Sequence, residues 1–561
     1  MVFALECVYP AAARLTDMER NLRTYIEDIL HREIGSDVPF SVERQEGRSS
    51  QGGARGDYSS NIALVRAKVE KRLPMAVAED IALRIKEKHL PVFSKIEAAA
   101  PGFLNFYFDK QYLIEILRDS FVPTQKPKLG TASVEYISAN PTGPMHIGNA
   151  RSGPIGDVVA NLLKDRGYKV VREYFHNDAG AQIGHFADSL WHWYVIACGE
   201  QSVLDEGGYQ GEYIQEMGKA VHRKYGSNIL GKPDLYKRRI TKIALAGMLK
   251  DNLALARRMG IIFDKVVAES DLESKIKRAL TLLDKKGLLT KKEGAVWFTP
   301  KDGHLGEREA VVIKSDGTYV YFAGDIAYHA EKFNRADLVV DELGENHAGH
   351  VPKLRAIADA FQFPQKDFKV VVHGQVTLKK DGQVVSMAKR KGTFVTAEEL
   401  LDAVGKDAFR FFMLQYAPRS AMTFDMDLAR AKSKDNPVYY IQYAHARASS
   451  ILKKAGYQGR RKINYKKVLW SILETEAELA LIKMVLALPD VIAETVEDFQ
   501  LQRLSRFALD FARAFTHFYE TTHVIGERAD LEYARLALVS LFRETMQRQC
   551  KLMGISTPDT M

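Results

Sequence analysis

Apolar and polar positions repeat with a helical or a strand period in the first part of the chain. Over residues 16–34 and 74–89 the apolar positions recur at helical spacing, which predicts two helices. Residues 101–109 (PGFLNFYFD) alternate apolar side chains and predict a strand. A Gly- and Ser-rich turn, RSSQGGARGDYSS, separates the two helices. Residues 1–121 are therefore expected to form a compact α+β domain.

The pattern changes after residues 122–131, a short basic stretch with the Pro and Gly content of a linker. Residues 134–137 and 168–175 predict strands, residues 140–145 a turn and residues 149–166 the helix between them. This order is a βαβ unit and implies a parallel sheet with helices on its faces. Residues 185–300 read as a mostly helical insertion, and strand patterns return at 338–340 and 368–372.

From about residue 432 the chain repeats apolar helical faces to its end, without an internal repeat or a long low-complexity tract. The expected fold is therefore α/β, in three domains. A parallel-sheet domain over 132–431 lies between the N-terminal α+β domain and an all-α domain over 432–561.

Composition narrows the class of protein. The 561 residues are 46% hydrophobic and 27% charged, as in ordinary globular chains. The net charge of +9 permits a polyanionic partner without demonstrating one. Cys7, Cys198 and Cys550 are too far apart for a disulfide framework or a cysteine zinc ribbon, which fits a reducing compartment. With no basic signal-peptide start and no apolar run of about 18 residues, we expect a cytoplasmic protein without a membrane partner.

The most informative segment is VEYISANPTGPMHIGNARSGPIGD, in which a strand, a Pro/Gly turn and a helix follow one another. A helix N-terminus at the carboxyl edge of a parallel sheet suits a phosphate. His146 lies at the turn and can donate a hydrogen bond to it, and Gly148 leaves room for close approach. Neither G-x-G-x-x-G nor a P-loop is present. Taken alone, His146 is more often a structural or surface histidine.

This segment resembles the first nucleotide-binding motif of class I aminoacyl-tRNA synthetases. Together with REYFHNDAGAQI it is similar to arginyl-tRNA synthetases of bacterial type. The resemblance implies a Rossmann-like catalytic domain that forms arginyl-adenylate from L-arginine and ATP, then transfers arginine to the terminal ribose of tRNA(Arg). It also implies Mg²⁺ with ATP and a tRNA requirement for activation. The family's last box histidine is Asn149 here, whose amide can donate but cannot carry charge.

A second segment, VVHGQVTLKKDGQVVSMAKRKGTFVT, resembles the family's lysine loop, K-M-S-K-S. Ser386 and Ala388 replace its first Lys and its Ser, while Lys389 keeps a cation where negative charge develops on phosphates. Lys379 or Lys380 could offset the missing Lys; read alone, the KRK run is a solvated turn. The resemblance implies the catalytic residues His146, Asn149 and Lys389. The implied ATP site comprises Pro141, Gly143, His146, Gly148, Asn149, Gly374, Val376, Met387, Lys389 and Arg390.

A guanidinium presents a rigid planar fork of donors, so its pocket needs carboxylates and planar acceptors. The family pattern makes Asp325 the bidentate partner, packed by Tyr321, although Asp325 could instead cap a helix. Glu135 and Asn140 would hold the α-amino and guanidinium ends between them. A metal site at His347 and His350 is a weak alternative, because no third ligand follows by spacing, and no metal or zinc site is expected. The implied arginine site comprises Glu135, Ser138, Asn140, His146, Tyr321, Asp325, Asn346 and His347.

Residues 453–467 contain seven cations and no acid, with two tyrosines interleaved, which suits RNA but also describes an exposed loop. NPVYYIQYAHARASSIL and KLMGISTPDTM resemble the family's helical anticodon-binding domain. GDYSSNIAL and PGFLNFYF resemble its N-terminal domain, which contacts the tRNA elbow. Tyr440 fits the protein core equally well, and Asn61 and Tyr58 fit a helix cap and a packed aromatic. The implied tRNA contacts are Tyr58, Asn61, Tyr440, Lys453, Lys454, Arg460, Arg461, Lys462 and Met561.

Two alternatives stay open on the sequence. A class I synthetase for another amino acid such as cysteine would need a thiolate-binding zinc site, against which the cysteine count argues. A non-catalytic RNA-binding relative is consistent with the altered lysine loop and with Asn149, whereas His146, Gly148 and Lys389 argue against it. The expected partners are tRNA(Arg), L-arginine and ATP, with no DNA, and the resemblance implies a monomer.

Overall fold

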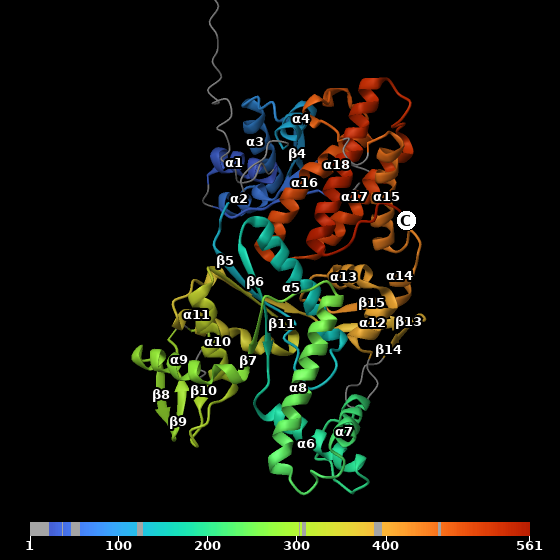
Figure 1. The fold of residues 1–561 in the computed structure, drawn as a ribbon. Coiled ribbons are helices and arrows are strands. Elements are labelled where there is room, and N and C mark those ends of the chain that lie inside the picture. The colour runs from blue at the N-terminus through green and yellow to red at the C-terminus, as the bar shows by residue number, and fades with distance from the viewer. Residues whose placement is uncertain are drawn as a thin grey trace, which may run out of the picture.

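The computed structural model describes residues 22–35, 38–45, 56–120, 127–301, 303–305, 310–385, 395–457 and 462–561. Its N-terminal part packs helices against an antiparallel sheet of order β1-β2-β4-β3 (Figure 1). The helix predicted over 16–34 is confirmed for its described residues, and the helix over 74–89 and the strand over 101–109 are confirmed. The elements are α1 (Leu22–Ile34), β1 (Val42–Arg44), β2 (Tyr58–Ser60), α2 (Ile62–Glu70), α3 (Pro74–Glu87), β3 (Phe93–Ala99), β4 (Phe103–Phe108) and α4 (Lys110–Asp119).

A five-stranded parallel sheet of order β12-β11-β5-β6-β7 forms the middle of the chain. Helix α5 (Ile147–Arg166) connects β5 to β6, so the predicted βαβ unit is confirmed. Strand β5 ends at Glu135 rather than at residue 137, because Ile137 and Ser138 turn the backbone into the left-handed region. The strands are β5 (Thr131–Glu135), β6 (Lys169–His176), β7 (Lys265–Ala268), β11 (Leu338–Gly344) and β12 (Phe368–His373).

Alternate residues of β5 face opposite sides of this sheet, as strand geometry requires. Ala132 and Val134 are fully buried in the core that also holds α5. Glu135 instead faces helix α10 (Tyr321–Arg335), where it pairs with Lys332. Helix α5 therefore packs on the apolar face of the sheet, and the charged helix α10 packs on the other face.

The structure differs from the mostly helical insertion expected over residues 185–300. The segment is helical through α6 (Ala181–Ala197), α7 (Glu212–Tyr225) and α8 (Pro233–Arg258), but β7 then joins the parallel sheet beside β6. After η1 (Glu269–Leu272) and α9 (Glu273–Lys285), strands β8 (Leu289–Lys292) and β9 (Ala295–Phe298) pair with β10 (Ala310–Ile313). Strands of four residues are too short to show a period in the sequence, so pairing alone identifies them.

The sheet is followed by η2 (Glu345–His350), α11 (Val351–Ala360) and η3 (Gln365–Asp367). A small sheet of order β14-β13-β15 then lies next to short helices (Figure 1). Its strands are β13 (Val376–Lys380), β14 (Gln383–Val385) and β15 (Met422–Asp425), and the helices are α12 (Ala397–Val404), α13 (Lys406–Leu414) and α14 (Met426–Arg430).

The described C-terminal residues form a helical bundle, as predicted. It consists of α15 (Pro437–Lys454), η5 (Tyr465–Lys467), η6 (Trp470–Ile472), α16 (Glu476–Asp498), α17 (Gln502–Thr521) and α18 (Ala529–Met553). The fully buried Arg410 joins this bundle to the parallel-sheet part, because it donates to Asp157 on α5 at 2.7 Å and to the carbonyl of Met553 at 2.8 Å. Among the described helices, none has the length and apolar composition needed to cross a bilayer.

Candidate active site

The turn after β5 is held in an unusual conformation. Ile137 and Ser138 have φ angles of 66° and 40°, which a β-branched residue rarely adopts. Two hydrogen bonds fix this turn: Ile137 N donates to the buried Ser152 Oγ at 2.7 Å, and Ser138 Oγ accepts from Phe175 N at 3.0 Å. Ser138 Oγ also donates to Glu135 Oε1 at 3.0 Å. Strain of this kind concentrates at functional sites, where the surrounding structure maintains it.

His146 is the N-cap of α5. Its Nδ1 accepts hydrogen bonds from the backbone N–H groups of Gly148 at 3.0 Å and Asn149 at 3.4 Å. Because Nδ1 accepts, the proton of the neutral ring lies on Nε2, which becomes the donor. His146 thus has a structural role as well as the predicted position at the turn. The ring also explains Gly148, since a Cβ there would lie 2.8 Å from His146 Cε1.

A cavity of about 900 Å³ opens beside this turn. Asn140, Gly143, His146 and Asn149 line it, so four of the predicted nucleotide and arginine residues share one cavity. The other wall comes from the α6–α7 hairpin, to which the sequence motifs assign no role. This wall contributes Gln182, Glu206, Gly207, Gly208, Tyr209, Gln210, Gly211 and Tyr213.

The hairpin wall is bonded to the first motif. Asn140 Nδ2 donates to Gln182 Oε1 at 2.8 Å, and the hydroxyl of Tyr213 donates to the carbonyl of Thr142 at 2.7 Å. Gly143 lies under the Tyr213 ring, which would be 3.1 Å from a Cβ at that position. The hairpin therefore shapes the cavity directly.

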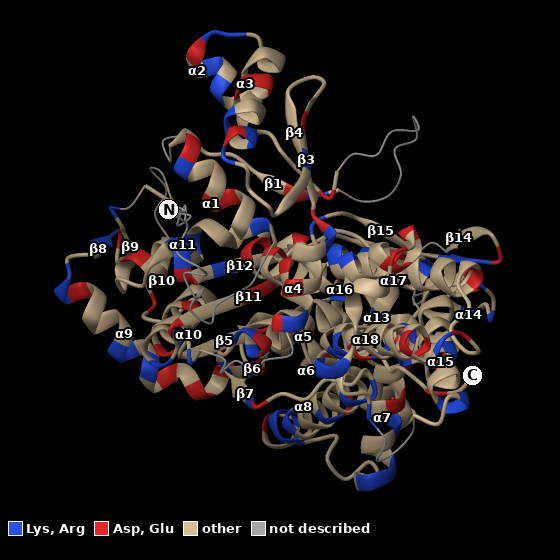
Figure 2. Cartoon of the chain, turned by 90° about the horizontal axis from the view of Figure 1, so that it is seen from above, with Lys and Arg blue, Asp and Glu red and all other residues tan. Residues whose placement is uncertain are grey.

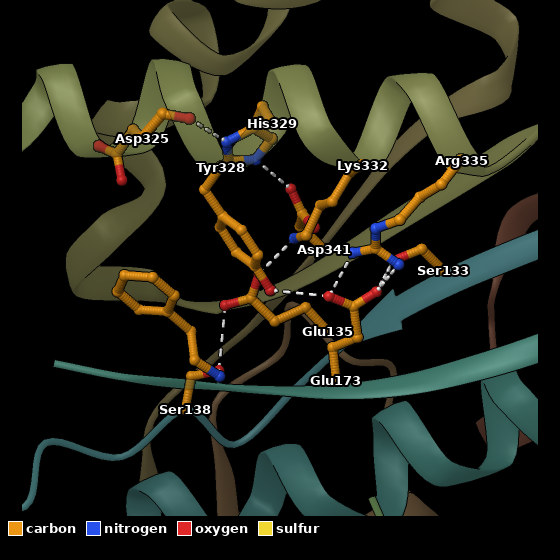
Figure 3. Close-up of polar contacts among 11 residues, drawn as sticks. Ser133, Glu135, Ser138, Glu173, Asp325, Tyr328, His329, Lys332, Arg335 and Asp341 are labelled. Atoms are coloured by element: carbon orange, nitrogen blue, oxygen red, sulfur yellow. Dashed lines mark hydrogen bonds and ion pairs between the residues drawn. The ribbon is translucent and has the colours of Figure 1, made fainter. Parts of the chain in front are cut away.

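An acidic cluster lies at the start of α10 and comprises Glu135, Glu269, Tyr321 and Asp325; we call it the acidic pocket. Asp325 is inside the helix, whose N-cap is Val320, so the helix-cap alternative for Asp325 is wrong. Burial, with Glu135 and Glu269 close by, raises the pKa of Asp325 to about 7. In Figure 3 the Asp325 carbonyl accepts from His329, whereas its carboxylate has no bond to the residues drawn. Within the part of the chain that the structure describes, this carboxylate has no hydrogen-bond or ion-pair partner.

Tyr321 and Glu269 complete the acidic pocket. Tyr321 is half exposed as a residue, yet loss of hydration around its hydroxyl, and then Asp325 and Glu135, raise its pKa. Glu269, from η1, comes within 3.8 Å of the position of a Cβ on Gly324, and burial raises its pKa. The predicted Glu135, Tyr321 and Asp325 are therefore neighbours. Glu269 was missed because the word ESDL carries no distinctive signal.

The residues after β12 make mainly structural contacts. Arg151, fully buried on α5, donates to the carbonyls of Gly374 at 2.8 Å, Ser420 at 2.7 Å and Ala417 at 3.1 Å. A Cβ on Gly374 would lie 2.7 Å from this loop's backbone. Val376 begins β13 and is buried. The ATP contacts predicted for Gly374 and Val376 stay predictions.

Asn346 and His347 lie exposed in η2, beyond the end of β11. The rings of His347 and His350 are 6.0 Å apart. Among the described residues, no group of three or more His, Cys, Asp or Glu side chains gathers as a metal site.

The predicted lysine loop, with Ser386, Met387, Ala388, Lys389 and Arg390, lies outside the described residues. The residues that follow it return to the first motif: Thr396 forms a β-bridge with His146, and Ala397 N donates to the carbonyl of Met145 at 2.9 Å. Lys379, one candidate to offset the missing lysine, pairs with Asp425 at 2.9 Å.

The predicted RNA contacts differ in exposure. Tyr58 is 2% exposed and bonded to Asp490, so an RNA contact does not agree with its position and the packed-aromatic alternative fits. Asn61 stands at the N-cap of α2 without a side-chain cap bond and accepts from Ser41 N at 2.8 Å. Tyr440 packs partly buried against the core. Arg460 and Arg461 lie outside the described residues, and Lys453, Lys454, Lys462 and Met561 are exposed.

Positive and negative side chains are mixed along the chain rather than segregated: Figure 2 shows Lys and Arg interspersed with Asp and Glu along most helices. The two lysines that end α15 are exposed at the bundle's surface, and the chain's tail runs along the same helix. There His445 Nδ1 lies 3.0 Å from the carbonyl of Pro558, and Ser449 Oγ donates to Asp559 at 2.7 Å.

Comparison with known families matches three successive parts of the chain. Residues 20–108 match the arginyl tRNA synthetase N terminal domain, residues 115–416 match the catalytic domain of class I (R) tRNA synthetases, and residues 441–561 match the DALR anticodon binding domain. The boundaries predicted at residues 121, 132 and 432 stay predictions.

Whole-chain relatives agree with this order. The arginine–tRNA ligase of Moorella thermoacetica is 37% identical over 518 residues, covering 90% of this chain and 92% of its own. That of Thermotoga maritima is 35% identical over 557 residues, covering 96% and 99%. The structure of Thermus thermophilus arginyl-tRNA synthetase, 21% identical, shares the fold with a TM-score of 0.72 and covers 96% of this chain and all of its own.

Proposed function

Since the chain belongs to the class I arginyl-tRNA synthetases, we propose that the first-motif cavity and the acidic pocket hold its two small substrates. The chain is an aminoacyl-tRNA ligase that joins L-arginine to tRNA with ATP as the energy source. Its small-substrate sites are assigned from the geometry described above.

ATP occupies the cavity beside the start of α5. The acceptor role of His146 Nδ1 supports this assignment, because it leaves Nε2–H as the donor for a phosphate oxygen. Asn149 adds an amide to the cavity lining. The oxygens of Glu206, Asn140 and Gln182 on the cavity wall suit Mg²⁺, which when bound with ATP offsets phosphate charge.

Arginine occupies the acidic pocket, and the unpartnered carboxylate of Asp325 is the observation that carries this assignment. Asp325 is only partly exposed and its carboxylate has no donor among the described residues, and a guanidinium would supply two parallel donors. Glu269 offers a second carboxylate on the same side. Both oxygens of Glu135 already have protein donors, so Glu135 contributes charge and shape.

The reaction has two steps and needs no covalent bond to the protein. The carboxylate of arginine attacks the α-phosphorus of ATP and pyrophosphate leaves. A terminal ribose hydroxyl of tRNA then attacks the arginyl carbonyl, and AMP leaves with the bonding electron pair. The chain contributes position and charge: Asp325 fixes the substrate side chain, and His146 with Lys389 stabilises the phosphates.

The remaining assignments follow the family. We propose that tRNA(Arg) contacts the exposed cations at the end of α15 and around residue 462, with Met561 nearby. The ATP contacts of Met387, Lys389 and Arg390, which lie outside the described residues, are proposed from the family resemblance. The low cysteine content supports a cytoplasmic location, and a monomer without a DNA partner is proposed from the family resemblance alone.

The test is ATP–pyrophosphate exchange with each of the amino acids, with and without tRNA. We expect exchange with arginine alone among them, and its loss in Asp325→Asn. His146→Asn keeps a good N-cap and His146→Ala does not, so both should lose exchange while only the second loses stability, by about 1 kcal/mol. Exchange with another amino acid would refute the substrate assignment, and no exchange under any condition would favour an inactive relative.

A further inference from the structure

Three acidic side chains lie in one row across the parallel sheet, beneath the acidic pocket. The strand register sets Asp341 on β11 opposite Glu135 on β5, and Glu135 opposite Glu173 on β6. Residues in register point to the same face of a sheet. Asp341 and Glu173 are buried, and the Glu135 side chain is 13% exposed. Because like charges directly opposite destabilise a sheet, this acid row requires compensation.

Compensation comes from α10, which carries a cation stripe of His329, Lys332 and Arg335 at intervals of three residues. Such spacing places side chains on one helix face. His329 Nε2 lies 2.8 Å from Asp341 Oδ2, and Arg335 pairs with Glu173. Figure 3 shows this stripe pointing from the helix onto the strands.

Lys332 connects the acid row to the acidic pocket. Its side chain is fully buried, and its Nζ donates to Asp341 Oδ1 at 2.6 Å and to Glu135 Oε2. Ser138 Oγ donates to the other oxygen of Glu135 at 3.0 Å. Both carboxylate oxygens of Glu135 are thus held by fixed donors.

The ion pairs between the cation stripe and the acid row determine which carboxylate remains available to a substrate. The stripe's side chains pair with all three members of the acid row, whereas Asp325 lies outside these pairs. Removal of the Lys332 ammonium, at the centre of the stripe, would leave Glu135 and Asp341 facing each other across adjacent strands. Glu135 would then move away from Asp341, and the wall beside Asp325 would change.

We infer that Lys332 is a positioning residue for arginine: it fixes Glu135 in the pocket wall and offsets the acid row, without touching the substrate. This inference rests on the proposed arginine site. It distinguishes Lys332 from a residue that only stabilises the fold, because only a positioning residue changes arginine binding selectively.

The experiment compares Lys332→Met with Arg335→Met. Both variants remove one cation of the stripe, but Arg335 pairs with Glu173, which lies outside the pocket wall. Arginine and ATP KM values are measured in tRNA-dependent exchange, with thermal unfolding recorded in parallel. For Lys332→Met we expect the arginine KM to rise by at least about tenfold, or about 1.4 kcal/mol, while the ATP KM stays within about twofold. Arg335→Met should leave both KM values near those of the unmodified chain.

Lys332→Gln covers the case in which Lys332→Met does not fold, since its amide keeps a donor for Glu135. It should raise the arginine KM selectively, though less than Met does. An unchanged arginine KM in the folded variant overturns the inference, as does a parallel rise in both KM values or an equal effect of Arg335→Met. If the unmodified chain shows no arginine-dependent exchange, the proposed site fails as well, so the two failures are distinguishable.

Discussion

The hydroxyl of Tyr58 donates a hydrogen bond to Asp490 Oδ2 inside the contact between the N-terminal domain and helix α16. Both side chains are buried. The N–H of Arg23 reaches the same oxygen at 3.3 Å, and Lys483 pairs with Asp57 at 2.7 Å nearby. The tyrosine that sequence resemblance assigned to RNA therefore joins two domains.

Asp490 should make this contact depend on pH. Burial raises its pKa from 3.8 to about 7, so the folded state holds a proton that the unfolded state has released. The contribution to stability is complete below pH 3.8 and is lost as the pH rises towards 7, by as much as about 4 kcal/mol. In Asp490→Asn this dependence should be absent, because the neutral amide still accepts from Tyr58. Urea unfolding at a series of pH values measures it.

Tyr58→Phe is the companion change. It removes the hydroxyl donor of Asp490, which keeps only the longer contact from Arg23 N at 3.3 Å, and should cost about 1–3 kcal/mol at neutral pH, where the carboxylate is partly ionised. If Asp490→Asn keeps the same pH slope as the unmodified chain, Asp490 is not the group responsible.

Gly148→Ala should separate the geometry of His146 from the stability of α5. The new Cβ would lie 2.8 Å from His146 Cε1, so the ring must leave its position, while alanine itself favours the helix. We expect a raised ATP KM and a stability change of at most about 2 kcal/mol from the lost cap. Gly184→Ala is the matched control, since no atom lies within 4 Å of its added Cβ. Equal ATP KM values in both variants would contradict the role of the His146 ring.

The sequence predicted the elements better than the side-chain partners. Long periodic segments such as those of α3 and α5, and the strands beside them, follow directly from apolar spacing. Strand β7 did not, because KVVA is four residues long and only its pairing with β6 identifies it. Helical periodicity reveals which face of a helix is buried, but it does not reveal what lies against that face.

The candidate site shows the same limit. His146 and Asp325 followed from motifs, yet Glu269 and Lys332 take part through strand register and helix packing, which one sequence does not encode locally. The stripe of His329, Lys332 and Arg335 has the spacing of an ordinary solvated face. The sequence left Tyr58 open between a tRNA contact and a packed aromatic for the corresponding reason, because its partner Asp490 is 432 residues away.

Arg151→Lys should destabilise the loop that closes the sheet edge. The guanidinium of Arg151 donates to three carbonyls, those of Gly374, Ala417 and Ser420, and an ammonium cannot span them. Each buried carbonyl left without a donor costs about 1–3 kcal/mol. We expect a clear fall in the free energy of unfolding and a higher ATP KM, measured on the same preparation. Full stability in Arg151→Lys would show that water or movement of the loop replaces these bonds.

The raised pKa of Asp325 should appear in the arginine KM. With a pKa of about 7 in the free enzyme, the carboxylate is mostly protonated below that pH and cannot pair with a guanidinium. The arginine KM is therefore expected to rise about tenfold for each pH unit below 7 and to level off above it, whereas the ATP KM should not follow.

Glu331→Gln is the control, because this carboxylate of the same helix pairs with Lys275 at 2.9 Å away from the pocket, and its variant should keep the full profile. Bound arginine stabilises the ionised form of Asp325, so binding at pH 7 should also release protons, which calorimetry in buffers of different ionisation enthalpy detects. A flat arginine KM between pH 5.5 and 7.5, about one and a half units below and half a unit above that pKa, would remove Asp325 as the guanidinium partner.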